Sequence, residues 1–438
     1  MPLAYVETLL TNFVRRLREE NLSSVYVHPQ FGPLADKEAV SLPSAGIYPP
    51  VKRETPLLIH LTVTGRCNAR CQGCINTTLT CQDRAEVLKV FETEPERDAR
   101  AILQLIHQTR APAVTLAFYG GEPFLALEKM EAIVSRLEEL SAVPLRYMVY
   151  TNGQLIDRAV ARDSSLLSKI WLLSVSIDGR PAQHARFRRG TDLETIRQNL
   201  RLFRSRSRAL LLQWSTLREG QSLWDCFEEF LFLYEQGLAD FFFWHLAETD
   251  EPFKDFLSFA RQYHRDLQKI LAVYLTYLAK GVLLPIVPLN DLLIFWLTGA
   301  RRGHSACGVE LATNFDLVGG KILACADLPP ELALGDVLPS GEIRLNGQEL
   351  LRRLVAYREV LGCEQCGVFA YCGGRCPVQV LTGSVKRTLS YCQLTRLFVA
   401  TVAEEMPAIE RAFSRLGLTP QKLYDHSAFL AYYTDVIP

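Results

Sequence analysis

Three cysteines, Cys67, Cys71 and Cys74, lie within eight residues of one another in the segment GRCNARCQGC. They follow the apolar run LLIHLTV, which predicts a buried strand with the thiols on the loop at its end. Three thiolates can ligate three irons of a four-iron–four-sulfur cluster and leave one iron open to a small chelating molecule. Zinc is the alternative, although no fourth Cys or His stands nearby at the usual zinc spacing.

A second group of cysteines lies between residues 307 and 392. Its seven members are Cys307, Cys325, Cys363, Cys366, Cys372, Cys376 and Cys392. Cys81 and Cys226 stand apart and are predicted to be ordinary thiols. The N-terminal segment MPLAYVETLLTNFVRR places its arginines after its apolar residues, which is not the order of a signal peptide. We therefore expect a cytoplasmic protein, in which clustered thiols indicate metal rather than a disulfide framework.

The overall composition excludes some classes of partner. The 438 residues include 48 Lys and Arg against 48 Asp and Glu, so the formal net charge is zero. This balance does not favour a nucleic-acid or an anionic membrane partner. The most apolar longer region, 270–299, is interrupted by Lys280, Pro285 and Asp291 and does not predict a membrane span.

Strand and helix patterns alternate between residues 57 and 248. The predicted strands are 57–63, 113–119, 146–152, 170–177, 209–216 and 241–248, and the predicted helices lie near 96–109, 126–141, 192–206 and 222–236. Asp192 is a plausible N-cap for the third of these helices. Buried strands that alternate with helices predict an α/β fold, a partial (β/α)6 TIM-type barrel with a small Cys-rich C-terminal domain.

Composition shifts divide the chain into five predicted parts. These are an N-terminal helical extension (1–54), the partial barrel (55–253), a helical connector (254–300), a Cys- and Gly-rich domain (301–395) and a C-terminal helical tail (396–438). The fourth part has few long periodic segments, which is typical of a small domain held together by metal rather than by a core.

Two further motifs follow the second and fourth predicted strands: AFYGGEPFL (117–125) and LLSVSIDG (172–179). Together with the cysteine triad, they make residues 55–250 resemble the radical S-adenosylmethionine (SAM) superfamily. The resemblance implies that the triad ligates a [4Fe-4S] cluster whose open iron chelates SAM. It also implies that Gly120, Gly121 and Glu122 hold the methionine amino group, and that Ser176 and Arg188 bind the ribose and the carboxylate.

Some of these residues also have simpler interpretations. Glu122 alone is equally typical of a carboxylate at a helix start, and Arg188 alone of a solvated face, with Arg189 as the neighbouring alternative. The family usually has an aromatic residue before the third cysteine, close to adenine, whereas this chain has Gly73. The local adenine contacts must therefore differ.

The seven later cysteines resemble the SPASM extension of radical SAM enzymes, which binds two auxiliary clusters. The resemblance implies three [4Fe-4S] clusters in all. Cys363, Cys366, Cys372 and Cys392 would close one auxiliary cluster, and Cys307, Cys325 and Cys376 would hold the other. The fourth ligand of the latter stays open between His304, water and a substrate group, because Arg301 stands where some relatives have cysteine.

The resemblance implies an oxidoreductase that acts on a peptide or protein side chain. We expect oxidative modification of a ribosomally made peptide, with Asp327 as a candidate proton acceptor. The alternatives are a sulfatase-type maturase that forms formylglycine and a non-catalytic electron-transfer scaffold. An electron donor such as flavodoxin or ferredoxin is implied, and a separate leader-peptide-binding protein is an open option.

Overall fold

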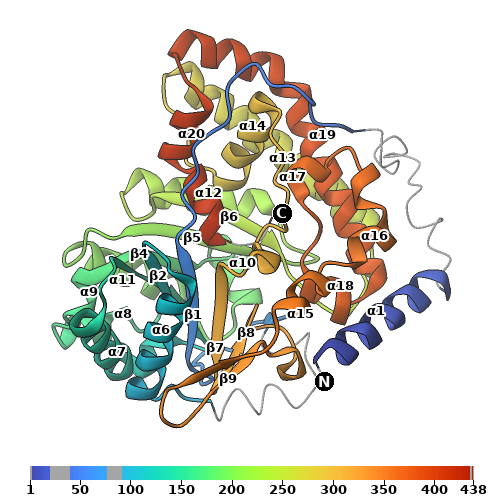
Figure 1. The fold of residues 1–438 in the computed structure, drawn as a ribbon. Coiled ribbons are helices and arrows are strands. Elements are labelled where there is room, and N and C mark those ends of the chain that lie inside the picture. Colours follow the sequence, from blue (N-terminus) through green and yellow to red (C-terminus); the bar gives the residue numbers. More distant parts are fainter. Residues whose placement is uncertain (1, 20–39, 76–90, 435–436, 438) are drawn as a thin grey trace.

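The computed structural model describes residues 2–19, 40–75, 91–434 and 437 (Figure 1). Its centre is a sheet of six parallel strands in sequence order. They are β1 (Leu57–Thr64), β2 (Val114–Gly120), β3 (Leu145–Thr151), β4 (Ile170–Ser176), β5 (Leu210–Leu217) and β6 (Phe241–Leu246). The predicted α/β fold with a partial TIM-type barrel is confirmed. The prediction for Cys81 falls outside the described residues.

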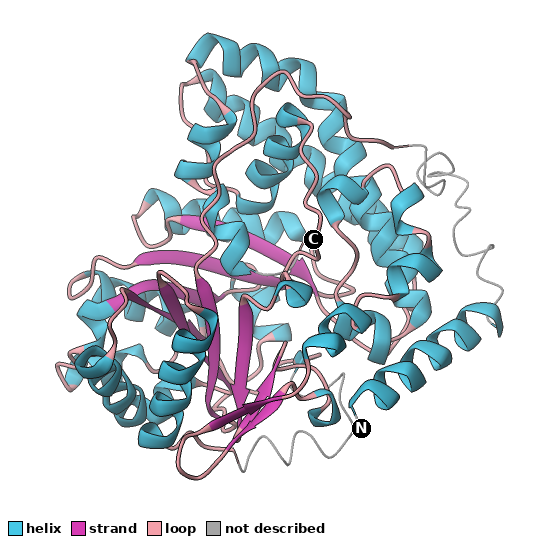
Figure 2. Ribbon diagram, in the orientation of Figure 1, coloured by secondary structure: helices cyan, strands magenta, loops and turns pink. Residues whose placement is uncertain are grey.

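Helices connect these strands, as parallel pairing requires. They are α6 (Pro95–Thr109), α7 (Leu127–Leu140), α8 (Ile156–Ala161), α9 (Leu166–Lys169), α10 (Pro181–Phe187), α11 (Leu193–Arg204) and α12 (Leu223–Glu235). Figure 2 shows the strands gathered in one twisted sheet with helices around it. The helix α11 begins as predicted, because the Asp192 side chain accepts a hydrogen bond from the Thr195 amide.

The sheet continues on the other side of β1. Four more strands follow in the order β7 (Asn314–Val318), β8 (Lys321–Leu323), β9 (Gly335–Val337) and β10 (Ile343–Leu345). β7 runs parallel to β1 and the other three pair antiparallel. The edge of β1 is thereby covered. The Cys-rich region therefore contributes strands to the same sheet as the barrel.

Most of the remaining helices lie above the sheet or to its right in Figure 1. They are α1 (Pro2–Glu19), α13 (Phe256–Ala279), α14 (Val287–Thr298), α15 (Gln348–Arg353), α16 (Tyr357–Leu361), α17 (Phe369–Cys372), α18 (Pro377–Thr382), α19 (Val385–Leu416), α20 (Pro420–His426) and α21 (Ala431–Thr434). In the part of the chain that is described, no helix is both long and apolar enough to cross a membrane.

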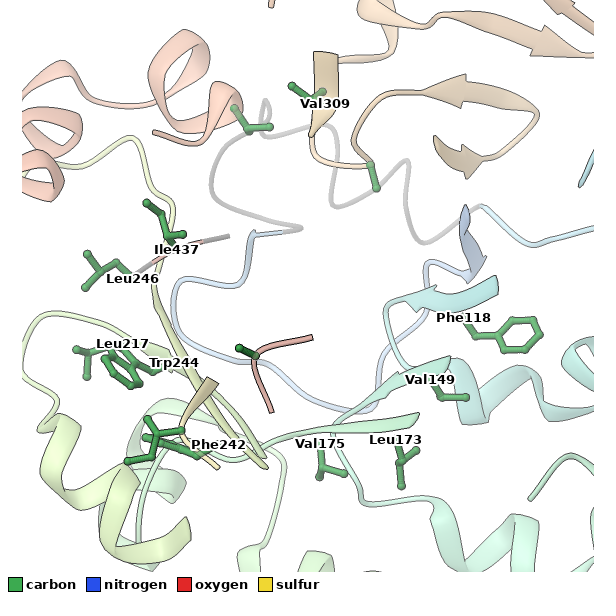
Figure 3. Packing of buried hydrophobic residues seen from close by; sticks show 14 of the residues in the cluster. Phe118, Val149, Leu173, Val175, Leu217, Phe242, Trp244, Leu246, Val309 and Ile437 are labelled. Carbon is green, nitrogen blue, oxygen red and sulfur yellow. The ribbon is translucent and has the colours of Figure 1, made fainter. Parts of the chain in front are cut away.

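Buried side chains form two separate clusters, one on each face of the sheet. The larger cluster packs the sheet against its helices, and Figure 3 shows Phe118, Val149 and Leu173 among its members. The smaller cluster joins inward-facing strand residues, such as Leu58 and Met148, to the C-terminal segment 428–434. The C-terminal segment therefore fills part of the barrel interior with apolar side chains.

Candidate functional site

A cavity of about 240 Å³ lies at the carboxyl ends of the parallel strands. Most predicted site residues line it: Cys67, Cys71, Cys74, Gly120, Gly121, Ser176, Arg188, Cys307, Cys325, Asp327 and Cys376. Parallel α/β folds place their ligand sites at this end of the strands. The fold thus brings the cysteine triad and three of the seven later cysteines to one cavity.

The loop that carries the triad packs directly on the loop after β2. The Gly121 amide donates to the Thr64 carbonyl at 2.8 Å, and the Glu122 amide donates to the Arg66 carbonyl at 2.9 Å. A Cβ atom on Gly120 would lie 2.4 Å from the Thr64 oxygen, and one on Gly121 would lie 2.2 Å from the Arg66 oxygen. Any larger residue would push the loops apart, so the Gly-Gly pair is needed for their close approach.

Glu122 is fully buried behind the cavity wall and does not line the cavity. Its carboxylate accepts hydrogen bonds from the Thr151 hydroxyl and the Asn152 amide, both at 2.7 Å, and from the Phe124 amide at 3.2 Å. Burial raises its pKa to about 7 although these hydrogen bonds oppose the rise. Glu122 therefore ties the loops after β2 and β3 together in this structure.

Asp178 forms the electrostatic centre of the wall beside the triad. Its carboxylate is fully buried and accepts from Arg188 Nε and from Arg218 Nη1, each at 2.7 Å. Burial alone would raise the Asp178 pKa, but the two guanidinium groups outweigh burial and lower it. Arg188 also reaches toward the Cys71 sulfur at 3.9 Å and the Thr216 hydroxyl at 3.3 Å. Asp178 thus orients two cations at the cavity wall.

Cys67 shows what the thiols require of a metal. The protein around Cys67 raises the pKa of its thiol although the residue itself is exposed, so the thiol is protonated at neutral pH in the metal-free chain. Metal binding must therefore displace a proton from it. The donor chemistry fits an iron–sulfur cluster, because three thiols face a cavity that also holds a buried cation.

The later cysteines fall into two neighbourhoods. The charge of Cys376 acts on Cys325 and that of Cys307 acts on Cys376, in each case raising the pKa. The charges of Cys366 and Cys372 act in the same way on Cys392, whose pKa rises to about 11, chiefly because of burial. The assignment of all seven cysteines to two auxiliary clusters stays a prediction.

The structure also bears on His304 as a cluster ligand and on a single metal ion such as zinc in place of a cluster. The His304 ring nitrogen Nδ1 lies 2.6 Å from the Ser305 carbonyl oxygen, and His304 is not among the residues that line the cavity. Among the described residues, no three His, Cys, Asp or Glu side chains are grouped tightly enough to hold one metal ion. The ligands of a four-iron cluster bind different irons and do not need such a grouping.

Sequence reasoning missed several polar and aromatic side chains on the cavity wall. His60 Nδ1 lies 3.5 Å from Asp316 Oδ1, and His245 Nδ1 lies 3.5 Å from Glu248 Oε2. Trp214 packs edge-on against Tyr150, with ring centroids 5.5 Å apart. Other members of this wall are Tyr119, Thr216 and Arg218. These residues lie on predicted strands or directly after them. Only the knowledge of which side chains point into the barrel distinguishes them from their neighbours.

Comparisons with known proteins were made for both the sequence and the fold. Residues 61–212 match the radical SAM superfamily. No curated protein matches the sequence. The structure of native anSMEcpe with bound AdoMet superposes with a TM-score of 0.61 at 17% identity, covering 82% of this chain and 100% of that chain. The same protein with bound AdoMet and the Cp18Cys peptide gives a TM-score of 0.61 at 19% identity, covering 82% and 99%.

A more distant likeness is to Streptococcus suis SuiB bound to S-adenosylmethionine. Its TM-score is 0.44 at 16% identity, covering 74% of this chain and 71% of that chain. This superposition is too loose to carry an argument. The likeness to anSMEcpe shows the fold, which extends over most of this chain.

Replacing Cys67, Cys71 and Cys74 together by alanine should remove one cluster. We expect the anaerobically reconstituted variant to hold about four fewer iron and four fewer sulfide ions per chain than the unchanged protein. Iron and sulfide analysis measures this loss. Cys226→Ala is the matched control, because Cys226 is buried in the larger hydrophobic cluster and should leave the iron content unchanged. Equal iron in the triple variant and the control would contradict the assignment.

Replacing Glu122 by glutamine should change the pH dependence of stability. A carboxyl group whose pKa is raised to about 7 on folding binds its proton more tightly in the folded state. Its contribution to the free energy of unfolding is fully present below the unfolded-state pKa and is lost as the pH rises through about 7. The contribution that is lost is about 3 kcal/mol. As the pH rises from 5 to 8, the free energy of unfolding should therefore fall less for Glu122→Gln than for the unchanged protein.

Thermal unfolding of the SAM-free protein across this pH range provides the measurement. Glu128→Gln serves as the control, because Glu128 lies on the exposed side of α7 and should leave the pH profile unchanged. Parallel pH profiles for Glu122→Gln and the unchanged protein would show that Glu122 does not titrate as its burial requires.

Proposed function

Because residues 61–212 form a radical SAM domain, we propose that this protein is a maturase that oxidises a side chain of a ribosomally made peptide. The observation that carries the proposal is the single cavity lined by both the triad and Cys307, Cys325 and Cys376. A substrate between the two thiol sets would face the SAM site on one side and an electron-accepting cluster on the other. The peptide complex of anSMEcpe, which shares the fold, supports a peptide substrate.

The proposal assigns the groups that hold the cofactors. Cys67, Cys71 and Cys74 would ligate the SAM cluster, and the loop of Gly120 and Gly121 would meet the methionine amino group. When bound, the cluster and SAM supply a 5′-deoxyadenosyl radical that removes a hydrogen atom from an unactivated carbon. Glu122, next to this glycine pair, completes the proposed contact with the amino group. The remaining residues of the proposed SAM site are Ser176, which ends β4 and lines the cavity, and Arg188.

Arg188 is suited to bind the carboxylate of SAM. Burial alone would lower its pKa, but the neighbouring Asp178 carboxylate raises it, so the guanidinium stays charged. Asp178 accepts from Nε at 2.7 Å and from Nη2 at 3.3 Å, while Nη2 also donates to the Thr216 hydroxyl and Nη1 reaches toward the Cys71 sulfur. A planar cation held in this way favours a carboxylate ligand.

Two auxiliary clusters complete the proposal, for three [4Fe-4S] clusters in all. Cys363, Cys366, Cys372 and Cys392 would close one, and Cys307, Cys325 and Cys376 would hold the other. In a two-electron oxidation, the substrate would lose a hydrogen atom, a proton and an electron. A side chain of this protein would take the proton, and an auxiliary cluster held by these cysteines would supply the electron acceptor. We further propose a cytoplasmic location, an electron donor such as flavodoxin or ferredoxin, and recognition of the leader by the barrel or by a separate protein.

Asp327 is our first candidate for the group that takes the proton. It lines the cavity, and its Oδ2 atom lies 4.0 Å from the Cys325 sulfur. A carboxylate next to the proposed auxiliary cluster would receive the proton close to where the electron leaves. The pair of His60 and Asp316 offers a second acceptor on the same wall.

A sulfatase-type maturase that forms formylglycine is the second candidate function. The likeness to the anSMEcpe fold, whose structures include complexes with the Cp18Cys and Kp18Cys peptides, gives it equal support. Sulfatase maturases usually place an aspartate directly after the cysteine that corresponds to Cys325. Here Ala326 intervenes before Asp327, which weighs against this function.

A mass-shift experiment under strict anaerobiosis tests the proposed function. Reconstituted protein, SAM and reductant would be given the short peptides encoded beside its gene and, in parallel, a Cys- or Ser-bearing sulfatase peptide. We expect loss of about two hydrogens from a neighbouring peptide together with 5′-deoxyadenosine. Conversion of the sulfatase peptide alone to an aldehyde would establish the second candidate. No 5′-deoxyadenosine with any peptide would indicate an electron-transfer scaffold.

Replacing Asp327 by asparagine should separate SAM cleavage from product formation. The asparagine side chain keeps the shape of the aspartate but cannot accept the proton, so product should fall by about 10²-fold or more while 5′-deoxyadenosine still forms. The ratio of product to 5′-deoxyadenosine, measured by mass spectrometry, reports the effect. Asp336→Asn is the control, because Asp336 is on β9 and forms a surface ion pair with Lys321. An unchanged ratio in Asp327→Asn would move the role to His60.

A further inference from the structure

Arg218 is a buried cation at the SAM side of the cavity that no motif predicted. It follows β5, is 7% exposed and lines the cavity. Its Nη1 atom makes every hydrogen bond of the side chain with the described residues: to Asp178 Oδ2 at 2.7 Å, to the Thr216 carbonyl at 3.0 Å and to Gln221 Oε1 at 3.4 Å. One side of the guanidinium is therefore fixed.

The other side of the guanidinium carries a hydrogen-bond donor that lacks an acceptor. Arg218 Nε is buried and has no hydrogen-bond partner among the residues that the structure describes. A buried donor of a charged group costs free energy when it lacks an acceptor. A ligand that brings an acceptor, or a polarisable flat face, to this side of Arg218 would remove that cost.

The position beside Arg218 is kept open by Gly73. This residue lies between Cys71 and Cys74 and has a backbone φ of +58°, which favours glycine. A Cβ atom built on Gly73 would lie 3.5 Å from Arg218 Nε and 3.7 Å from its Cδ. The Arg218 side chain therefore lies next to the space that a side chain at position 73 would enter. The resemblance to radical SAM enzymes implies an aromatic side chain at this position, close to adenine.

We propose that the Arg218 guanidinium forms one wall of the adenine site and replaces the aromatic side chain that position 73 lacks. This inference rests on the proposed SAM site. A planar cation stacks on an aromatic ring, and its free Nε–H, which lies in the plane of the guanidinium, suits an acceptor beside that ring rather than in it. The chemistry recognised is thus a purine base that adjoins the triad.

Asp178 anchors the two arginines so that their side chains extend in different directions. Its Oδ2 atom accepts from Arg188 Nε and from Arg218 Nη1, so each guanidinium is anchored by a different edge. Arg188 extends toward the Cys71 sulfur, where the amino-acid end of SAM belongs. Arg218 extends toward Gly73 instead. The two cations therefore address opposite ends of the same cofactor.

Arg218→Lys is the decisive variant. It keeps a cation beside Asp178 but loses the planar surface and the Nε–H donor. With anaerobically reconstituted protein, isothermal titration calorimetry should show SAM and 5′-deoxyadenosine binding roughly tenfold more weakly. The change that methionine causes in the electron paramagnetic resonance (EPR) spectrum of the reduced triad cluster should be unaltered, because methionine has no adenine.

Arg188→Lys is the matched control, because it changes the other cation that Asp178 holds. It should weaken the methionine effect on the EPR spectrum and leave the affinity for 5′-deoxyadenosine unchanged. If Arg218→Lys does not fold, Arg218→Gln takes its place, since glutamine is uncharged but keeps a flat donor group. For that variant we expect a smaller loss of affinity for 5′-deoxyadenosine than for Arg218→Leu.

Two results would overturn the inference. One is an affinity of Arg218→Lys for SAM and 5′-deoxyadenosine equal to that of the unchanged protein. The other is an equal loss of the methionine effect and of 5′-deoxyadenosine binding, which would mean that Arg218 acts only through Asp178 and Arg188. Failure of the unchanged, cluster-loaded protein to bind SAM would instead refute the proposed function.

Discussion

The candidate site depends on one buried carboxylate. Asp178 is fully buried at the end of β4, and it is tolerated there because Arg188 and Arg218 supply two cations at hydrogen-bond distance. Removing water from three charges is costly unless each is paired and fixed. The same requirement orients both arginines, one toward the triad and one toward Gly73. The same three side chains therefore neutralise the buried charge of Asp178 and orient the two arginines toward the cavity.

β1 joins the two halves of the site. It pairs with β2 on one side and β7 on the other, and the loop after it carries the triad. His60 of β1 stands opposite Asp316 of β7 in the parallel register, so the pair forms as soon as the strands align. The short antiparallel strands that follow β7 then bring Cys325 to the same cavity as Cys74. Sheet pairing thus explains how Cys325, far from the triad in sequence, comes to share one cavity with it.

Much of the fold and part of the site could be predicted from the sequence, because strand patterns and motifs are local. The six strands and the cap at Asp192 are of this kind. The pairing of His60 with Asp316 could not be predicted, because it depends on a contact across about 250 residues. Arg218 carries no motif, and its role emerges only from its contact with Asp178. For Glu122, the sequence showed a carboxylate but not the three donors that enclose it.

The C-terminal segment supplies the apolar side chains that lie beneath the cavity. Leu430 and Tyr433 join Leu58 and Met148 in the smaller apolar cluster, so apolar side chains fill the barrel interior beneath the cavity. The Tyr150 hydroxyl donates to the Tyr433 carbonyl at 3.0 Å, which links this apolar filling to the aromatic and histidine side chains above it. Reactive intermediates survive where water is excluded. Polar chemistry is thereby confined to the upper layer, where both thiol sets and the proton acceptors meet.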